Sequence, residues 1–168
     1  MKAIEHAHFG RVEARAPDGA DAVWEGTARL GDDEVEAQLW AGPSSEPDVD
    51  ELDALAACLT DLSALDTAAR TALRTYLHED RYFIDFHVEE LEDSETLARL
   101  VRDAAGEAVG ADSFTAAMRL SRVGLWLGDL SDGAPVILDY TFDPDLSDQI
   151  LAVKSTRDGT VVSVDWES

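Results

Sequence analysis

Two histidines and a glutamate near the middle of the chain are the residues best suited to chemistry. His87 and Glu90 have a His-x-x-Glu spacing, which would place both side chains on one face of a helix. His78 lies upstream and could add a third ligand, because imidazole and carboxylate groups commonly bind zinc and other transition metals. Such pairs also arise by chance, and a histidine beside acids at the edge of an aromatic cluster is the competing interpretation. His78, His87 and Glu90 are therefore candidates for the metal site of a metal-dependent enzyme.

Other reactive residue types have simpler explanations. Cys58 falls on the apolar stripe of an expected helix, which favours core packing over a nucleophilic role. The segment Asp143–Asp148 begins like a calcium-binding loop, but Lys154 stands where such a loop needs a bidentate glutamate, so a turn is expected. His6 and His8 alone are too few to make a metal site. We expect no catalytic residue and no cofactor.

The tryptophans suggest a contact surface. All four fall in expected strands, and Trp40 alternates with Leu39, so it should lie on the face opposite the core. An exposed tryptophan is a plausible anchor for a partner protein, although core packing is the alternative. Glu36 shares the parity of Trp40, and Asp139 is the polar residue within another apolar strand. Trp40, Glu36 and Asp139 are our partner-binding candidates.

Charge is the most unusual feature of the composition. Thirteen Lys and Arg residues against 36 Asp and Glu residues give a net charge of −23. Such a surface disfavours binding to nucleic acid or to an anionic membrane. Three interpretations stay open: a solvated acidic surface suited to high salt, a surface that steers a basic protein partner, and cation binding.

Length and cysteine content limit the class of protein. A chain of 168 residues suits one domain spanning residues 1–168, and no apolar run is long enough for a membrane-spanning helix. The first residues lack the apolar core of a signal peptide, and a single cysteine excludes an internal disulfide. We therefore expect a cytoplasmic protein.

Hydrophobic periodicity predicts grouped strands and helices. Strands are expected over 9–15, 24–30 and 35–41, and helices over 48–62, from Asp66 to 77 and over 94–105, with a further short helix favoured over a strand at 82–91. Strands should follow from Phe114 onward, with a bulge near Ser121–Arg122 where the apolar parity switches. The order βββ-ααα-ββββ predicts an α+β fold: an antiparallel sheet of about six to seven strands with three helices packed on one face.

The last two strands should form a hairpin. Asp158-Gly159 is typical of a two-residue turn, which would pair Ser155 with Val162, Val153 with Val164, and Leu151 with Trp166. This register gathers Leu151, Val153, Val162, Val164 and Trp166 on one apolar face.

Several short segments resemble a bacterial family known as domain of unknown function two thousand and four. They are Phe114 to Leu127, Asp139-Tyr140-Thr141, Asp148 to Val153, Val164 to Ser168, and Tyr82 to Leu91. The resemblance implies a small bacterial cytoplasmic protein of unassigned activity and supplies no catalytic residues.

Together these features predict a non-enzymatic protein-binding module. Its partner would be a basic protein, for example a toxin domain neutralised by an immunity-type protein. The chain is expected to be a monomer or a homodimer. The metal-dependent enzyme using His87 and Glu90 is the alternative.

Overall fold

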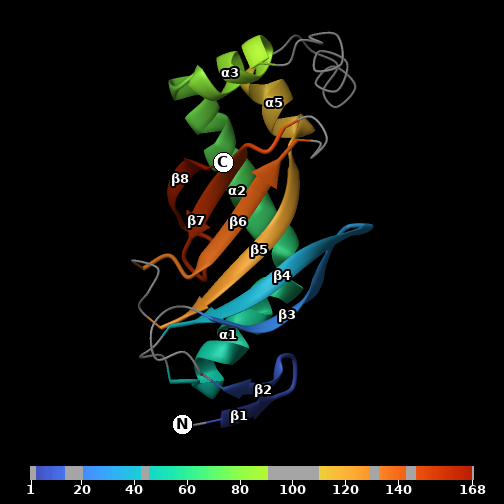
Figure 1. Cartoon of the computed structure of the whole chain (residues 1–168), viewed down its shortest axis with the longest axis vertical. Coiled ribbons are helices and arrows are strands. Elements are labelled where there is room, and N and C mark those ends of the chain that lie inside the picture. Colours follow the sequence, from blue (N-terminus) through green and yellow to red (C-terminus); the bar gives the residue numbers. More distant parts are fainter. Residues whose placement is uncertain are drawn as a thin grey trace.

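The computed structural model describes residues 3–13, 21–42, 46–90, 110–128, 133–142 and 147–167, which form an α+β fold (Figure 1). Its centre is a mixed sheet of six strands in the order β3-β4-β5-β6-β7-β8. The strands are β3 (Asp21–Leu30), β4 (Asp33–Ala41), β5 (Arg119–Leu127), β6 (Val136–Thr141), β7 (Ile150–Ser155) and β8 (Val161–Glu167). A separate two-stranded hairpin precedes them, made of β1 (Ala3–His6) and β2 (Gly10–Glu13).

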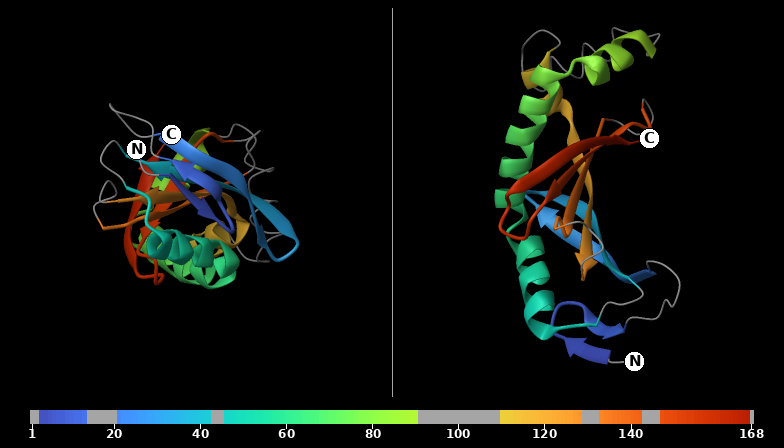
Figure 2. Two further views of the ribbon diagram at one scale, coloured as in Figure 1. Left: turned by 90° about the horizontal axis from the view of Figure 1, so that it is seen from below. Right: turned by 90° about the vertical axis from the view of Figure 1, so that its left-hand side faces the viewer.

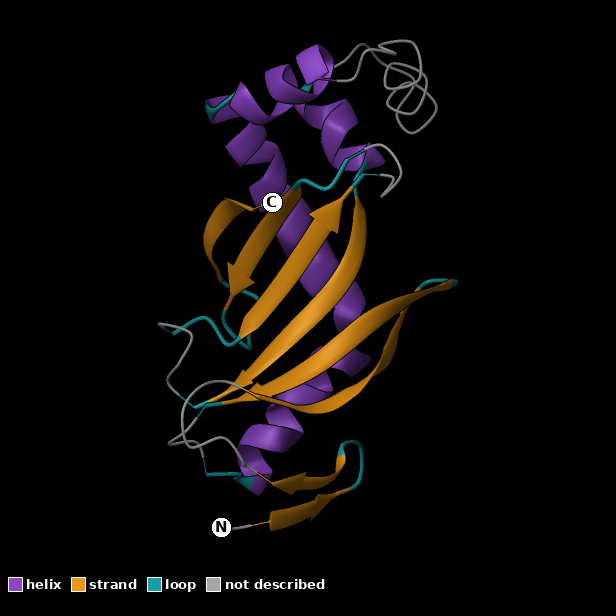
Figure 3. Ribbon diagram, viewed as in Figure 1, coloured by secondary structure: helices purple, strands orange, loops and turns teal. Residues whose placement is uncertain are grey.

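The described residues include four helices. They are α1 (Val49–Thr60), α2 (Leu62–Glu79), α3 (Tyr82–Glu90) and α5 (Ala111–Ala117). Figure 2 shows α1 and α2 running along one side of the six-stranded sheet, while Figure 3 shows α3 and α5 beyond one end of it. Within the described part of the chain, no helix is both long and apolar enough to cross a membrane.

The core lies between the sheet and the helices α1 and α2. The strand β6 illustrates how the sequence builds it, because Val136, Leu138 and Tyr140 are buried while Ile137 and Asp139 are only partly buried. The helix α2 adds an apolar stripe of Leu62, Leu65, Ala69, Leu73 and Leu77. Burial of these two surfaces against each other is the main force that holds the layers together.

The predicted bulge in β5 is confirmed. Leu120 pairs with Tyr140 but Arg122 pairs with Asp139, so Ser121 is the extra residue. This insertion lets Leu120 and the later apolar residues of β5 reach the same core although their parity differs.

One strand pairing differs from the prediction of a wholly antiparallel sheet. β4 and β5 are parallel neighbours, whereas every other neighbouring pair of the six-stranded sheet is antiparallel. The helices α1 and α2 carry the chain back along the sheet before β5 begins (Figure 1), so β5 enters in the same direction as β4. The predicted order βββ-ααα-ββββ is also wrong, because four strands precede the helices and the helix α5 immediately precedes β5.

Two predicted element boundaries were wrong. The second helix begins at Leu62 rather than with Asp66 as its N-cap, because Leu62 and Leu65 extend its buried stripe by a turn. Phe114 belongs to the helix α5 instead of a strand; the Ser113 hydroxyl bonds to the backbone of Gly110 and closes the first turn. The short helix predicted over 82–91 is confirmed as α3, and the helix predicted over 94–105 lies outside the described residues.

The β7–β8 hairpin keeps part of its predicted register. Leu151 pairs with Trp166 and Val153 with Val164, as predicted. The turn has three residues instead of two, since the Thr156 N–H donates to the Thr160 carbonyl and Gly159 adopts a φ of 92°. A bulge absorbs the extra residue.

Because of that bulge, Ser155 pairs with Val161 and the predicted pairing of Ser155 with Val162 is wrong. Val162 is 54% exposed rather than part of the apolar face, while Val161 packs against the core.

Candidate functional site

The sheet face opposite α1 and α2 is the candidate site. None of the described helices covers it, and it faces the viewer in Figure 1. The strand register places on it every second residue of each strand. We call this surface the open face and define it by Glu25, Glu36, Gln38, Trp40, Arg122, Gly124, Trp126, Ile137, Asp139, Lys154, Asp165 and Glu167. The three residues predicted from the sequence to bind a partner, Trp40, Glu36 and Asp139, all lie here.

One end of the open face is aromatic. Trp40 and Trp126 are register partners on the parallel strands β4 and β5, and their rings stack with centroids 5.5 Å apart and planes 16° apart. Both side chains remain partly exposed. The Trp126 indole reaches toward Gly124, where an added Cβ would lie 3.7 Å from the Trp126 Nε1 atom. Alternation placed Trp40 correctly, but the sequence carries no signal for its partner Trp126, because parallel pairing joins segments far apart in the chain.

The other end is charged. Glu36, Arg122 and Asp139 lie side by side on β4, β5 and β6. The Arg122 guanidinium pairs with Glu36 at 3.7 Å, and Lys154 pairs with Asp165 at 3.0 Å. The surface is therefore not uniformly acidic, and Arg122 and Lys154 each bind a carboxylate.

Asp139 is different from its neighbours. Its carboxylate makes no hydrogen bond or ion pair with any residue that the structure describes, although the side chain is partly buried. Burial raises the pKa of Asp139 and the Glu167 carboxylate raises it further, while Arg122 and Lys154 act in the opposite direction. Asp139 is thus a desolvated acid without a bonded counter-charge, and it lies on β6, one of the two middle strands of the sheet.

His87 lies on the buried side of α3 in a closed site. The side chain is 1% exposed and its ring lies among Phe83, Phe86 and Phe142. The Nδ1 atom lies 2.8 Å from the Phe83 carbonyl, which can only accept, so Nδ1 carries the hydrogen. The Nε2 atom then accepts from the Ser147 hydroxyl at 2.8 Å. Burial lowers the pKa of His87, and the bond to Phe83 offsets this in part.

The predicted metal ligands are engaged separately. Both ring nitrogens of His87 already have hydrogen-bond partners, so a metal would have to displace one of them. His78 lies on the surface of α2, 3.3 Å from Asp112 on α5, and the side chain of Glu90 lies outside the described residues. The described part of the chain contains no cluster of three or more His, Cys, Asp or Glu residues placed to hold a metal ion.

The Ser147–His87 pair has one feature of a nucleophile and its base. The hydroxyl is within hydrogen-bond distance of the imidazole, and a third group orients the ring. However, the imidazole is closed off by aromatic rings, and the Ser147 oxygen also accepts from the Gln149 N–H at 3.1 Å. Gln149 in turn accepts from the Trp166 indole at 2.7 Å. The chain of bonds ties α3 to the segment just before β7 and to Trp166 on β8, which is a structural role.

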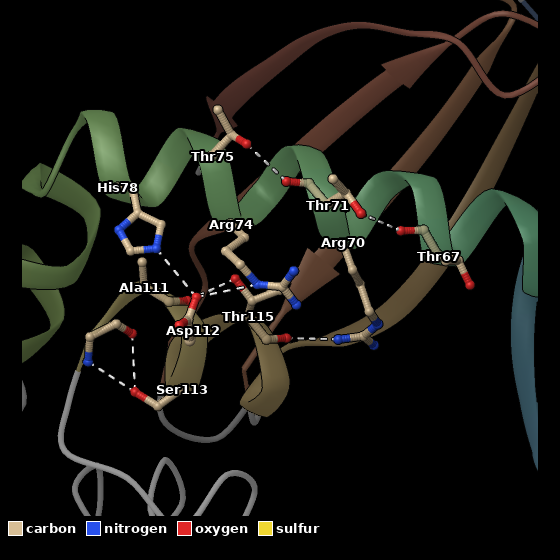
Figure 4. A network of polar contacts seen from close by, with 11 residues as sticks. Thr67, Arg70, Thr71, Arg74, Thr75, His78, Ala111, Asp112, Ser113 and Thr115 are labelled. Atoms are coloured by element: carbon tan, nitrogen blue, oxygen red, sulfur yellow. Dashed lines mark hydrogen bonds and ion pairs between the residues drawn. The ribbon is translucent and has the colours of Figure 1, made fainter.

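A polar network that sequence reasoning missed joins α2 to α5 (Figure 4). Arg70 donates to the Thr115 carbonyl at 2.7 Å, and Arg74 and His78 both approach Asp112 at 3.3 Å. The three bases follow one another at four-residue spacing, which places them on one side of α2. This spacing is visible in the sequence, but Asp112 as their partner is not.

The same arginine reaches the core. Arg70 pairs with Asp66 at 3.1 Å, and the Tyr140 hydroxyl donates to Asp66 at 2.6 Å. Burial, then the bond to Asp66, raises the pKa of Tyr140, so its hydroxyl remains a donor. Asp66, which the sequence suggested as a helix cap, instead ties α2 to the sheet.

A surface hollow lies beside the start of α1. It is lined by Asp48, Asp50, Glu51, Gly128, Gly133, Pro135, Thr156 and Arg157. Two of its carboxylates are engaged, because Asp48 caps α1 and Glu51 accepts from the Gly128 N–H at 2.9 Å. Nearby, Cys58 is buried, and burial raises the pKa of its thiol, so its predicted core position is confirmed.

No family model, no curated protein and no solved structure matches this chain. The resemblance to the domain of unknown function two thousand and four family therefore stays a prediction, and the site has to be interpreted from its own geometry.

Proposed function

We propose that this protein is a non-enzymatic binding module that docks a basic protein on the open face. The observation that carries the proposal is the stacked Trp40–Trp126 pair on the same sheet surface as an acid without a bonded counter-charge, Asp139.

Tryptophan suits an anchoring role because it buries a large area at low conformational cost. Interface residues that dominate binding free energy are enriched in tryptophan and lie in the middle of the contact. A partner that covers Trp40 and Trp126 removes the remaining exposed indole surface from water. The pair is already stacked, so little side-chain order has to be gained on binding.

The net charge favours a basic protein as the partner. A charge of −23 attracts cationic proteins over distances of about a Debye length, roughly 8 Å at physiological salt, and repels nucleic acids and acidic proteins. Attraction of this kind raises association rates and excludes wrong partners more than it adds affinity. A basic toxin domain neutralised by an immunity-type protein is the concrete version of this proposal.

Defined basic proteins, including basic toxin domains, test the proposal. Affinity is measured for the wild type and for Trp40→Ala and Trp126→Ala variants at low and at moderate salt. We expect each tryptophan variant to weaken binding about thirtyfold, as loss of an interface anchor does.

Tyr82→Ala is the matched control, because Tyr82 is a 75% exposed aromatic residue on α3. Its affinity should stay within about twofold of wild type. Thermal melts verify that each variant folds. Failure of any basic protein to bind at low salt, or equal binding by all variants, would remove the proposal.

A further inference from the structure

The two ends of the open face are separated by a fixed distance. Trp126 and Arg122 are four residues apart on β5, as are Trp40 and Glu36 on β4, which corresponds to about 13 Å along a strand. Asp139 is the register partner of Arg122, so it lies at the charged end. No single side chain of a partner spans both ends.

A middle row separates the aromatic end from the charged end. It contains Gln38, Gly124 and Ile137 on β4, β5 and β6. Gly124 has no side chain, and a Cβ placed there would meet only ordinary contacts at 3.7 Å or more. Gly124 itself is buried, and the Trp126 indole and Ile137 are its nearest side-chain neighbours.

Within the described residues, Asp139 forms no ion pair, although two cations are near. Arg122 binds Glu36 at 3.7 Å and Lys154 binds Asp165 at 3.0 Å, so both cations act on Asp139 from a distance while forming ion pairs with other carboxylates. A carboxylate that has lost water without gaining a bonded partner is destabilising, and a cation from outside would supply the missing interaction. The unmatched charge points to a cationic group as the ligand.

Resting on the proposed function, we infer that the basic partner contacts the open face through an extended segment with two groups about 13 Å apart. One is an apolar side chain against the Trp40–Trp126 pair, and the other is an arginine or lysine that pairs with Asp139. An extended segment fits because its side chains on one face repeat every two residues, as do the three rows of the open face. The apolar and cationic residues of the partner are therefore four positions apart.

Acid weakens this contact through Asp139. The charged groups that face its carboxylate are Arg122 on β5, Lys154 on β7, and Asp165 and Glu167 on β8. Only the ionised form of Asp139 pairs with a cation. Because the pKa of the unoccupied carboxyl is raised, affinity should fall with decreasing pH before an ordinary aspartate is protonated.

A display library of random short peptides, selected on the full chain at neutral pH and moderate salt, tests the inference. We expect enriched peptides to carry an arginine or lysine four positions from an apolar residue. Enriched peptides are then synthesised and titrated against wild type, Trp126→Ala, Asp139→Asn and Asp32→Asn. Asp32 is exposed at the β3–β4 turn and loses the same charge away from the site.

Asp139→Asn and Trp126→Ala should each weaken binding at least about tenfold, and Asp32→Asn should not. Asp139→Asn should also abolish the loss of affinity toward acid pH. Peptides that bind Asp139→Asn as tightly as wild type, or whose basic and apolar residues follow a helical spacing, overturn the inference. In that case the proposed function stands if binding still requires the tryptophans. Selection of peptides without basic residues, or of none, overturns both.

Discussion

Two titratable residues, His87 and Asp139, should respond to acid in opposite directions. Burial lowers the pKa of His87 and raises the pKa of Asp139. Between its folded pKa and its unfolded value, His87 binds more protons in the unfolded chain, so its contribution to stability is lost as pH falls. Asp139 binds more protons in the folded chain over its own window, so acid favours folding there.

The His87 contribution should be measurable as a slope. We expect the free energy of unfolding of the wild type, relative to His87→Gln, to fall as pH decreases below about 6.5, by at most about 1.4 kcal/mol per pH unit. Comparing the two proteins cancels the change in overall charge repulsion. Urea unfolding across this pH range measures the difference, and Asp139→Asn supplies a control of opposite sign. Parallel pH curves for wild type and His87→Gln would contradict the assignment of His87 as a buried neutral histidine.

Local patterns predicted single residues well where only alternation was needed. Trp40, Glu36 and Asp139 followed from strand parity, and Cys58 from helical parity. The partners of these residues did not follow, because the contact of Trp40 with Trp126 and that of His87 with Ser147 depend on the tertiary fold. The metal interpretation of His78, His87 and Glu90 rested on spacing alone, and the two histidines make separate hydrogen bonds.

Among the elements, the β7–β8 hairpin shows how one residue changes a face. The three-residue turn and the bulge place Val161 against the core and Val162 in solvent. A two-residue turn would have done the reverse.

A matched pair of substitutions tests that register. Val161→Thr should cost about 1 kcal/mol of unfolding free energy, because it places a hydroxyl at the edge of the core, while Val162→Thr should stay within about 0.5 kcal/mol. Thermal or urea unfolding measures both. The opposite order of the two values would restore the register predicted from the turn sequence.

Element types followed from periodicity, but their arrangement did not. The bulge in β5 was predicted because the apolar parity switches within one strand. The parallel pairing of β4 with β5 was missed, since hydrophobic alternation is the same whichever direction a neighbour runs. The strands were expected to begin at Phe114, but this residue lies in the helix α5, and the first strand of the segment begins at Arg119.

At the scale of the whole molecule, charge is the dominant property. A net charge of −23 on 168 residues implies strong repulsion among surface carboxylates, and the described ion pairs neutralise only some of them. Repulsion destabilises the compact state independently of any partner.

Salt should therefore stabilise the protein. We expect the thermal midpoint to rise by several degrees between about 0.1 M and about 1 M NaCl, where the screening length shortens from about 10 Å to about 3 Å. Sucrose is the control, since it favours compact states without screening charge. A midpoint that does not respond to NaCl would show that the acids are already compensated in the fold.

The parallel pairing of β4 with β5 also decides when the Trp40–Trp126 pair can form during folding. The two strands lie far apart in the chain, so pairing them closes a long loop. The entropy cost of closing that loop makes this pairing a late step of folding. Trp40 on β4 and Trp126 on β5 stack across this pair of strands. A chain emerging from the ribosome consequently lacks the stacked Trp40–Trp126 pair until Trp126 has been synthesised and β5 has joined β4.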